Sequence, residues 1–159
     1  MNLFIDIHQQ WIKNLISANV DFIIIGGYSV IFHGYKRTTG DIDIWLKPDN
    51  SNKEKLLGVL RQFNYAEEDI LEIAALDFND RLVFSIDEAP EKIDFLTYIN
   101  LVNYDDADKN KIIAEVDGMH IPFLHMNDLV LSKMNTGRPK DIADIDMLQQ
   151  VEKERNYPN

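Results

Sequence analysis

The feature that most restricts the fold of this chain is an apolar run that ends in two glycines. Residues 21–25 predict a buried strand, because the run is short, rich in isoleucine and bounded by Gly26 and Gly27. Two aspartates one residue apart, Asp41 and Asp43, follow after a short amphipathic segment and a polar loop. Strand, glycine pair and acidic pair therefore form the unit around which the other predicted elements are arranged.

Hydrophobic periodicity and turn signals place further elements on both sides of this unit. We expect helices over 3–18, 28–33, 52–63 and 128–135, a helical turn over 103–109, and a last helix from Pro139. We expect strands over 41–46, 81–86, 92–98, 112–116 and 119–124, with antiparallel hairpins joining the second to the third and the fourth to the fifth. Ser51 and Asn127 are expected to cap the helices that follow them. Residues 70–76 fit either a strand or a short helix, and residues 152–159 fit a fraying charged tail.

Composition excludes some classes of protein and leaves others open. A length of 159 residues favours one domain, and the lack of cysteine excludes disulfides and thiol catalysis. No apolar segment approaches the ~20 residues that span a bilayer, so we expect a cytoplasmic protein with no membrane association. The formal charge of −11 gives no overall attraction to nucleic acid, and no basic stripe with interleaved aromatic residues marks a dedicated nucleic-acid-binding module.

The glycine pair suits a turn that binds phosphate. A strand that runs through Gly26 and Gly27 into a helix exposes unpaired backbone N–H groups, and glycine lets a phosphate approach the backbone closely. Ser29 adds a hydroxyl donor nearby. The pattern is neither the dinucleotide-binding glycine motif nor the Walker motif, so the glycines alone also fit any tight strand-to-helix turn.

The two aspartates suit a divalent metal. Asp41 and Asp43 share one face of their predicted strand, because side chains two residues apart point the same way. Two carboxylates this close repel each other unless a cation lies between them. Oxygen ligands of this type suit Mg²⁺, which completes its shell with substrate phosphates and water. The alternative is a solvated edge strand with a charged outer face.

Asp94 is the best candidate for a third carboxylate. It lies in an apolar strand segment, where a charge is costly unless it has a partner. A strand there, antiparallel beside residues 41–46, would place Asp94 next to the acidic pair. In a phosphoryl-transfer site, such a carboxylate acts as general base on the attacking hydroxyl or binds the nearer metal. The alternative is a salt bridge to Lys92 or Arg81.

Together these residues resemble the DNA polymerase β-type nucleotidyltransferase superfamily. The resemblance rests on Gly26-Gly27, thirteen intervening residues, Asp41-Ile42-Asp43-Ile44 and a distant strand aspartate. The local form Arg37-x-Thr39-x-Asp41 is similar to that of small bacterial nucleotidyltransferases, including the toxin–antitoxin and antibiotic-modifying branches. Residues 127–144 resemble the closing segment of that group, so the similarity runs over about residues 10–150.

The resemblance implies a fold, a reaction and a cofactor. The fold is α+β, a single domain over 1–159 with a mixed, mostly antiparallel sheet flanked by helices and the C-terminal helices of 127–152 packed on it. The reaction is metal-dependent transfer of a nucleoside monophosphate from an NTP to an acceptor hydroxyl on a protein, an RNA end or a small molecule, with release of pyrophosphate. The expected cofactor is Mg²⁺, two ions, with Mn²⁺ as a substitute. The alternative is a toxin–antitoxin component that acts by binding a protein partner, toxin or antitoxin, on the same scaffold.

The resemblance also assigns roles to individual residues. Gly26, Gly27 and Ser29 would hold the β- and γ-phosphates. Asp41 and Asp43 would bind two metal ions, and Asp94 the catalytic one. Contacts to the triphosphate are expected from Arg37 and Lys133, with Arg138 and Lys140 as further candidates, and with a structural ion pair as the alternative for Arg37. Asp141 and Asp144 are expected to be helix N-terminal charges or salt-bridge partners rather than ligands.

Overall fold

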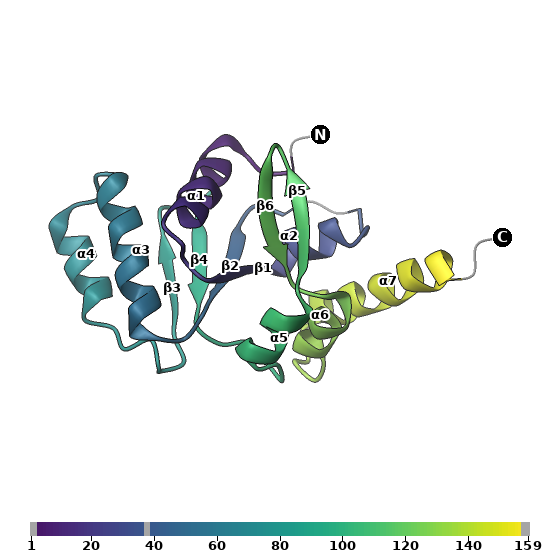
Figure 1. Cartoon of the computed structure of the whole chain (residues 1–159). Coiled ribbons are helices and arrows are strands. Elements are labelled where there is room, and N and C mark those ends of the chain that lie inside the picture. Colours follow the sequence, from purple (N-terminus) through teal and green to yellow (C-terminus); the bar gives the residue numbers. More distant parts are fainter. Residues whose placement is uncertain (1–2, 37–38, 157–159) are drawn as a thin grey trace.

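One mixed sheet forms the centre of the computed structural model, which describes residues 3–36 and 39–156. Within those residues six strands follow one another in the order β3-β4-β2-β1-β6-β5 (Figure 1). Their bounds are β1 Phe22–Ile25, β2 Ile42–Leu46, β3 Val83–Ile86, β4 Ile93–Leu96, β5 Ile112–Val116 and β6 Met119–Phe123. The pairs β1–β2, β3–β4 and β5–β6 are antiparallel, whereas β1–β6 and β2–β4 are parallel.

Helices cover both faces of the sheet. Their bounds are α1 Asp6–Ser17, α2 Gly26–Phe32, α3 Asn50–Gln62, α4 Glu67–Ala74, α5 Tyr104–Asn110, α6 Met126–Lys133 and α7 Pro139–Asn156. The core side chains of α1, α3 and α4 pack on one face, and those of α5, α6 and α7 pack on the other. In the described part of the chain, no helix is both long and apolar enough to cross a membrane.

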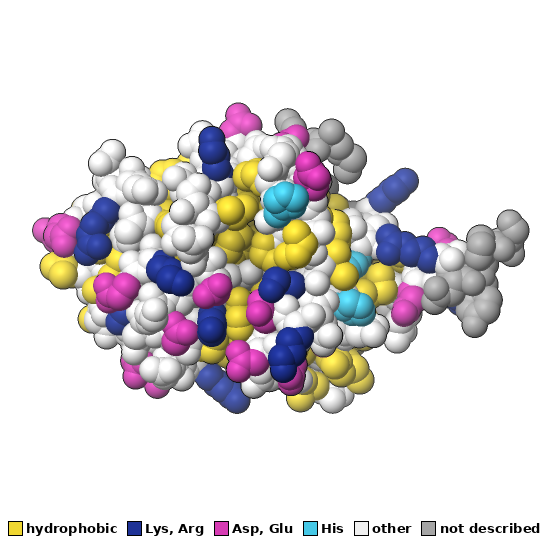
Figure 2. Space-filling view, in the orientation of Figure 1, with side chains coloured by type: hydrophobic (Ala, Val, Ile, Leu, Met, Phe, Trp, Pro, Cys, Tyr) yellow, Lys and Arg dark blue, Asp and Glu magenta, His cyan; other side chains and the backbone are white. Residues whose placement is uncertain are grey.

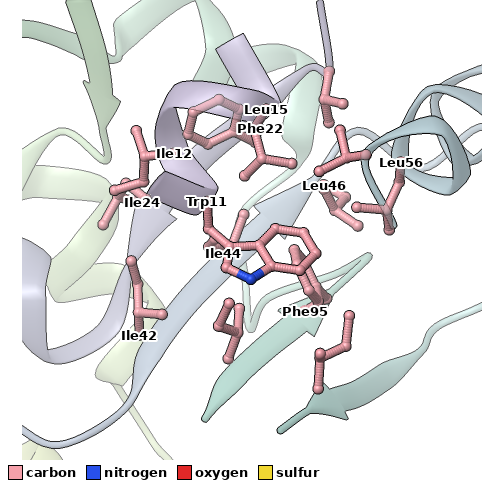
Figure 3. Close-up of a cluster of buried hydrophobic side chains, with 14 of the residues drawn as sticks. Trp11, Ile12, Leu15, Phe22, Ile24, Ile42, Ile44, Leu46, Leu56 and Phe95 are labelled. Carbon is pink, nitrogen blue, oxygen red and sulfur yellow. The ribbon is translucent and has the colours of Figure 1, made fainter. Parts of the chain in front are cut away.

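The larger core lies between the sheet and α1. Trp11 of α1 is fully buried there, and its ring stacks on Phe63 at 4.6 Å and meets the edge of Phe95 at 5.9 Å. Figure 3 shows Trp11 among isoleucines, leucines and phenylalanines of the strands and of α3. Burial of each such side chain stabilises the fold by roughly 1.5–3 kcal/mol, so this face holds the strands rigidly.

The acidic residues of the strands lie on the other face. Ile42 and Ile44 of β2 belong to the α1 core, so by alternation Asp43 points to the face covered by α5, α6 and α7. Trp45 lies on that second face and is almost fully buried. Asp94 follows the same rule, because Phe95 beside it belongs to the α1 core. One face of the sheet therefore carries the larger core, and the other carries the carboxylates.

The predicted direction of the strand that carries Asp94 is wrong. β4 runs parallel to β2, not antiparallel, although Asp94 does lie directly beside Asp43 in the register. After β2 the chain passes through α3 and α4 to the edge strand β3, and the hairpin then returns it as β4 in the direction of β2. The sequence pattern within one strand carries no information on this crossover. The position of Asp94 beside Asp43 could therefore be predicted, but the direction of β4 could not.

Both predicted helix caps are wrong by two residues. The side chain of Asp49, not Ser51, caps α3 and accepts from the backbone N–H of Asn52 at 2.7 Å. His125, not Asn127, caps α6, where its Nδ1 accepts from the N–H of Asn127 at 3.0 Å. Each helix begins earlier than predicted, and the cap is the last residue with extended backbone.

Other helix bounds also differ from the prediction. The ambiguous segment forms a helix, α4, in which Ile70 faces the core. The second helix begins at Gly26 rather than at residue 28, and α5 is longer than one turn. α7 continues to Asn156 instead of fraying from residue 152, because the Arg155 guanidinium donates to the carbonyl of His33 at 3.1 Å. α7 is thereby attached to the end of α2.

Candidate active site

The centre of the candidate site is a close contact between the backbone of Gly26 and the carboxylate of Asp43. Ile25, the last residue of β1, pairs with Asp43 of β2, so Gly26 follows directly at the turn into α2. A Cβ atom built on Gly26 would lie 2.1 Å from Asp43 Oδ2, and the φ of Gly26 is +66°. The lack of space and the positive φ both favour glycine at position 26, where the backbone contacts the carboxylate of Asp43 directly.

Negative charge accumulates around Asp43. Burial, the charges of Asp94 and Asp41 and a hydrogen bond with Asp94 together raise the pKa of Asp43 to about 6, and the charge of Lys140 opposes them. The effect of Lys140 also means that the start of α7 lies near this part of the sheet. A carboxyl in this position is more easily ionised when an additional cation is present.

Asp94 has two polar partners of its own. The hydroxyl of Ser85, opposite it in the β3–β4 hairpin, donates to Asp94 Oδ1 at 2.5 Å. The ammonium of Lys92 lies 3.4 Å from Asp94 Oδ1 and 3.9 Å from Asp41 Oδ2. The salt bridge to Lys92, weighed from the sequence as an alternative for Asp94, is therefore present, and it includes Asp41.

The donor set suits a divalent metal, but the side chains are not arranged around one. Among the described residues, no group of three or more His, Asp or Glu side chains is placed to hold a metal ion. The three carboxylates nonetheless offer oxygen ligands only, stand on or beside adjacent strands, and carry more negative charge than Lys92 compensates. Those properties fit Mg²⁺ or Mn²⁺ chemically, with the side chains rotating onto the ion.

Of the residues predicted to hold phosphate, the structure places the two glycines beside the carboxylates. Gly26 and the buried Gly27 form the first turn of α2, beside Asp43. The Ser29 side chain is fully buried, and its hydroxyl has no hydrogen-bond partner among the described residues. Arg37 lies outside the described residues. The turn thus lies next to the carboxylates, whereas the phosphate contacts of Ser29 and Arg37 stay predictions.

Lys133 lies in a second cluster, built by α6 and α7. Its ammonium is 3.3 Å from Asp141 Oδ1 and 2.9 Å from Asp144 Oδ2, and all three side chains are buried. The salt bridges expected for Asp141 and Asp144 are therefore confirmed. Both carboxylates point at Lys133, so the phosphate contact predicted for this lysine stays a prediction.

Asp141 is the most heavily bonded carboxylate of that second cluster. Burial works to raise its pKa, but hydrogen bonds from Thr136 and Arg138, with the charge of Lys133, outweigh burial and hold the pKa below its usual value. The Thr136 hydroxyl and the Arg138 Nε each donate to Asp141 Oδ2 at 2.7 Å. The neighbours of Asp141 therefore stabilise its ionised form, whereas burial and the neighbouring carboxylates disfavour the ionised form of Asp43.

Sequence reasoning missed two residues of the site. Lys92 was considered only as an ion-pair partner of Asp94, and Ser85 was given no role. A signal existed for both, since Lys92 stands two residues before Asp94 and Ser85 lies opposite it in a hairpin that was predicted. Lys140 was a minor candidate, and no local pattern indicates that it lies near Asp43.

The carboxylates differ in exposure, and the side chain of Asp94 is only 19% exposed. Asp41 has 41% of its side chain exposed. A cavity of about 420 Å³ between α4 and β3 includes Ser85 in its wall, and one of about 580 Å³ beside α2 and α7 includes His33 and Arg155. Neither of these two is lined by the three carboxylates. On the face drawn in Figure 2, basic and acidic side chains are interspersed rather than gathered in a basic stripe.

Comparison with known proteins agrees with this geometry. The model of a family described as "Nucleotidyltransferase of unknown function (DUF6036)" matches residues 3–154. No curated protein matches the sequence.

Two solved structures show the fold. TM1012 of Thermotoga maritima, assigned as a nucleotidyltransferase, has a TM-score of 0.53 and 16% identity over 94% of this chain and 89% of that one. The lincosamide antibiotic adenylyltransferase LnuA, solved with lincomycin bound, has a TM-score of 0.56 and 16% identity over 95% and 99%. The predicted fold, a mixed and mostly antiparallel sheet flanked by helices, is confirmed.

Proposed function

The chain belongs to the nucleotidyltransferase family that its residues 3–154 match, and on that premise we propose that it is an active enzyme. It transfers a nucleoside monophosphate from an NTP to an acceptor hydroxyl and releases pyrophosphate, in the presence of Mg²⁺ or Mn²⁺. The observation that carries this proposal is that Asp43 and Asp94 lie side by side on adjoining strands, with Asp41 just before β2 and the backbone of Gly26 against Asp43. A degenerate scaffold that only binds a partner has no need of this contact.

The three carboxylates have distinct parts in the proposed reaction. Asp41 and Asp43 would hold the divalent ions, and Asp94 would bind the ion nearer the acceptor. When bound, such ions neutralise charge on the triphosphate and on the leaving pyrophosphate. The raised pKa of Asp43 agrees with this role, because the cation would favour the ionised carboxylate.

Positive and unblocked groups near the carboxylates would position the triphosphate. The first turn of α2 has no side chain at Gly26 or Gly27, so phosphate oxygens can approach its backbone. Lys140 is near enough to Asp43 to affect its pKa and would lie beside the phosphates, as a point charge. Arg37, Ser29 and Lys133 remain candidates for contacts to the triphosphate.

The chemistry is an in-line displacement at the α-phosphorus. The acceptor oxygen forms a bond to that phosphorus, and the bond from phosphorus to the β-phosphate oxygen breaks, so pyrophosphate leaves with that electron pair. Asp94, in hydrogen-bond contact with Ser85, would accept the proton of the acceptor hydroxyl. Fixing the reactants on two adjacent strands supplies the alignment that such a displacement needs.

A labelling experiment tests the proposal. The purified chain is incubated with each of the four NTPs labelled at the α-phosphate, with Mg²⁺, and with a cell extract separated into macromolecules and small molecules. ATP is tested first, because LnuA is named an adenylyltransferase. We expect one fraction to gain label only when Mg²⁺ is present, and that fraction identifies the acceptor class.

Two isosteric variants serve as matched controls. Asp43→Asn removes one negative charge at the site, and Glu115→Gln removes one at an exposed position of β5. Labelling is expected to disappear in the first and to persist in the second. If no fraction is labelled and no NTP binds in a Mg²⁺-dependent manner, the enzymatic proposal is wrong, and stable capture of one protein would favour the binding role.

A further inference from the structure

Lys92 occupies the position where a cation is needed. Its ammonium lies within 3.4 Å of Asp94 and 3.9 Å of Asp41, two of the three carboxylates of the site. An ammonium and a divalent ion seek the same carboxylate oxygens and repel each other at such distances. A metal ion bound by Asp41 and Asp94 would therefore meet Lys92 directly.

The backbone on both sides of this lysine is fixed. The carbonyl of Glu91 contacts Nε2 of His8, a fully buried residue of α1, at 3.0 Å. The carbonyl of Lys92 itself accepts from the N–H of Ile42 at 3.4 Å, at the start of β2. The backbone of Lys92 is thus held beside the carboxylates, so its ammonium stays within reach of them.

Its side chain can nevertheless leave. Lys92 is 37% exposed, so it has access to solvent, and its Coulomb attraction to each carboxylate is weakened there. Lys133 differs, because it is only 10% exposed and is enclosed by Asp141 and Asp144. Of these two lysines, Lys92 is therefore the one that another cation can displace from its carboxylate partners.

We propose that Lys92 is a built-in competitor of the metal. Without nucleotide, its ammonium bridges Asp41 and Asp94, reduces their repulsion and keeps free divalent ions from binding tightly. When a metal ion binds together with a triphosphate, Lys92 would pair with phosphate oxygens instead, and Asp41 and Asp94 would be free to bind the metal. Metal loading is thereby coupled to nucleotide binding. This inference rests on the proposed function, since it takes the same three carboxylates as metal ligands.

Binding of Mn²⁺ alone tests this role. Calorimetric titration without nucleotide compares the wild type with Lys92→Met, Lys92→Arg, Lys140→Met and Asp43→Asn. Lys92→Met is expected to bind Mn²⁺ on the order of tenfold more tightly, because the competing charge is lost. Lys92→Arg retains a cation and is expected to bind as the wild type does. Lys140→Met removes a charge that acts only at longer range and is expected to have a smaller effect.

Thermal unfolding separates competition from a structural role. In EDTA, Lys92→Met is expected to melt below the wild type, and saturating Mn²⁺ is expected to close that gap. A gap of the same size in both buffers, or unchanged or weaker Mn²⁺ binding by Lys92→Met, overturns the inference. If Asp43→Asn abolishes binding while Lys92→Met has no effect, only the role of Lys92 fails. If no protein binds Mn²⁺ with or without an NTP, the proposed function fails with it.

Discussion

The molecule contains two clusters of aspartates and a lysine that differ in charge balance. In the strand cluster, two of the three carboxylates on and beside β2 and β4, those of Asp41 and Asp94, share Lys92, which is partly exposed. In the helix cluster, Asp141 and Asp144 surround the buried Lys133, and Arg138 and Thr136 add further hydrogen bonds. The strand cluster has more negative than positive charge, whereas the cations of the helix cluster match its carboxylates in number.

The pKa directions follow from this difference. The pKa of Asp43, which is half-buried, is raised, whereas the pKa of Asp141, which is buried, is lowered. Burial raises the pKa in both places, so the sign depends on whether neighbours compensate the charge. A compensated cluster holds two helices together, while an uncompensated one is suited to receive a cation from outside.

The largest expected effect is on catalysis by the strand cluster. Asp43→Asn is expected to lower the initial rate of nucleotidyl transfer on the order of 10³-fold, about 4 kcal/mol, because charge stabilisation by the bound ion is lost. The variant should keep the circular dichroism spectrum of the folded protein and should melt cooperatively. An active Asp43→Asn protein, or an unfolded one, would contradict the distinction between the clusters.

The next effect concerns stability and belongs to the helix cluster. Lys133→Met is expected to lower the free energy of unfolding by about 3 kcal/mol, because it removes a buried cation that pairs with two buried carboxylates. In metal-free buffer, Lys92→Met is expected to lower it by less than about 1 kcal/mol, as for an exposed pair. Urea denaturation measures both, and similar losses would show that the clusters play the same structural role.

Gly26→Ala tests the contact between backbone and carboxylate. A left-handed backbone at a residue with a side chain, together with displacement of Asp43, is expected to cost about 2 kcal/mol of stability. Gly58→Ala is the control, since position 58 is inside α3 and nothing lies within 4 Å of a Cβ there. That control is expected to be neutral or stabilising by about 0.5–1 kcal/mol, measured in the same urea titration. Equal behaviour of the two variants would refute the contact.

The smallest expected effect is a pH dependence. The pKa of Asp43 in the folded state, about 6, lies above its ordinary value of 3.8, so folding favours the protonated form. The stability that Asp43 contributes is therefore present below about pH 4 and lost as the pH rises through about 6. In EDTA at pH 8, Asp43→Asn is expected to be about 1–2 kcal/mol more stable than the wild type, after allowance for partial exposure, and the gain should vanish near pH 4. A gain that does not depend on pH would point to another cause.

Local sequence pattern was sufficient for much of the fold and the centre of the site. Alternation placed Asp41 and Asp43 on the face of their strand opposite Ile42 and Ile44, and the register places Asp94 beside Asp43 as expected. The direction of β4 depends on a crossover through α3, α4 and β3, which no pattern within one strand encodes. For the same reason, the approach of Lys140 to Asp43 had no local signal.

The role of Lys133 shows a different limit. A lysine followed by two aspartates three residues apart can be a phosphate ligand or one half of a buried salt bridge, and the spacing is the same in both cases. What distinguishes them is burial and the number of partners, which depend on how α7 packs on α6. Patterns identify candidate charges well, but the balance of charge around each one is a property of the folded chain.

The contact at Gly26 has a consequence for how sequences related to this one diverge. A side chain at position 26 and a carboxylate at position 43 cannot both be accommodated as the backbone stands, so the two positions should be inherited as a pair. A homologue that loses the aspartate no longer needs the glycine, and any larger residue at position 26 becomes tolerable apart from its backbone conformation. Alignments of divergent members should therefore show covariation between the two positions. The residue at position 26 would then indicate which members have lost the carboxylate at position 43.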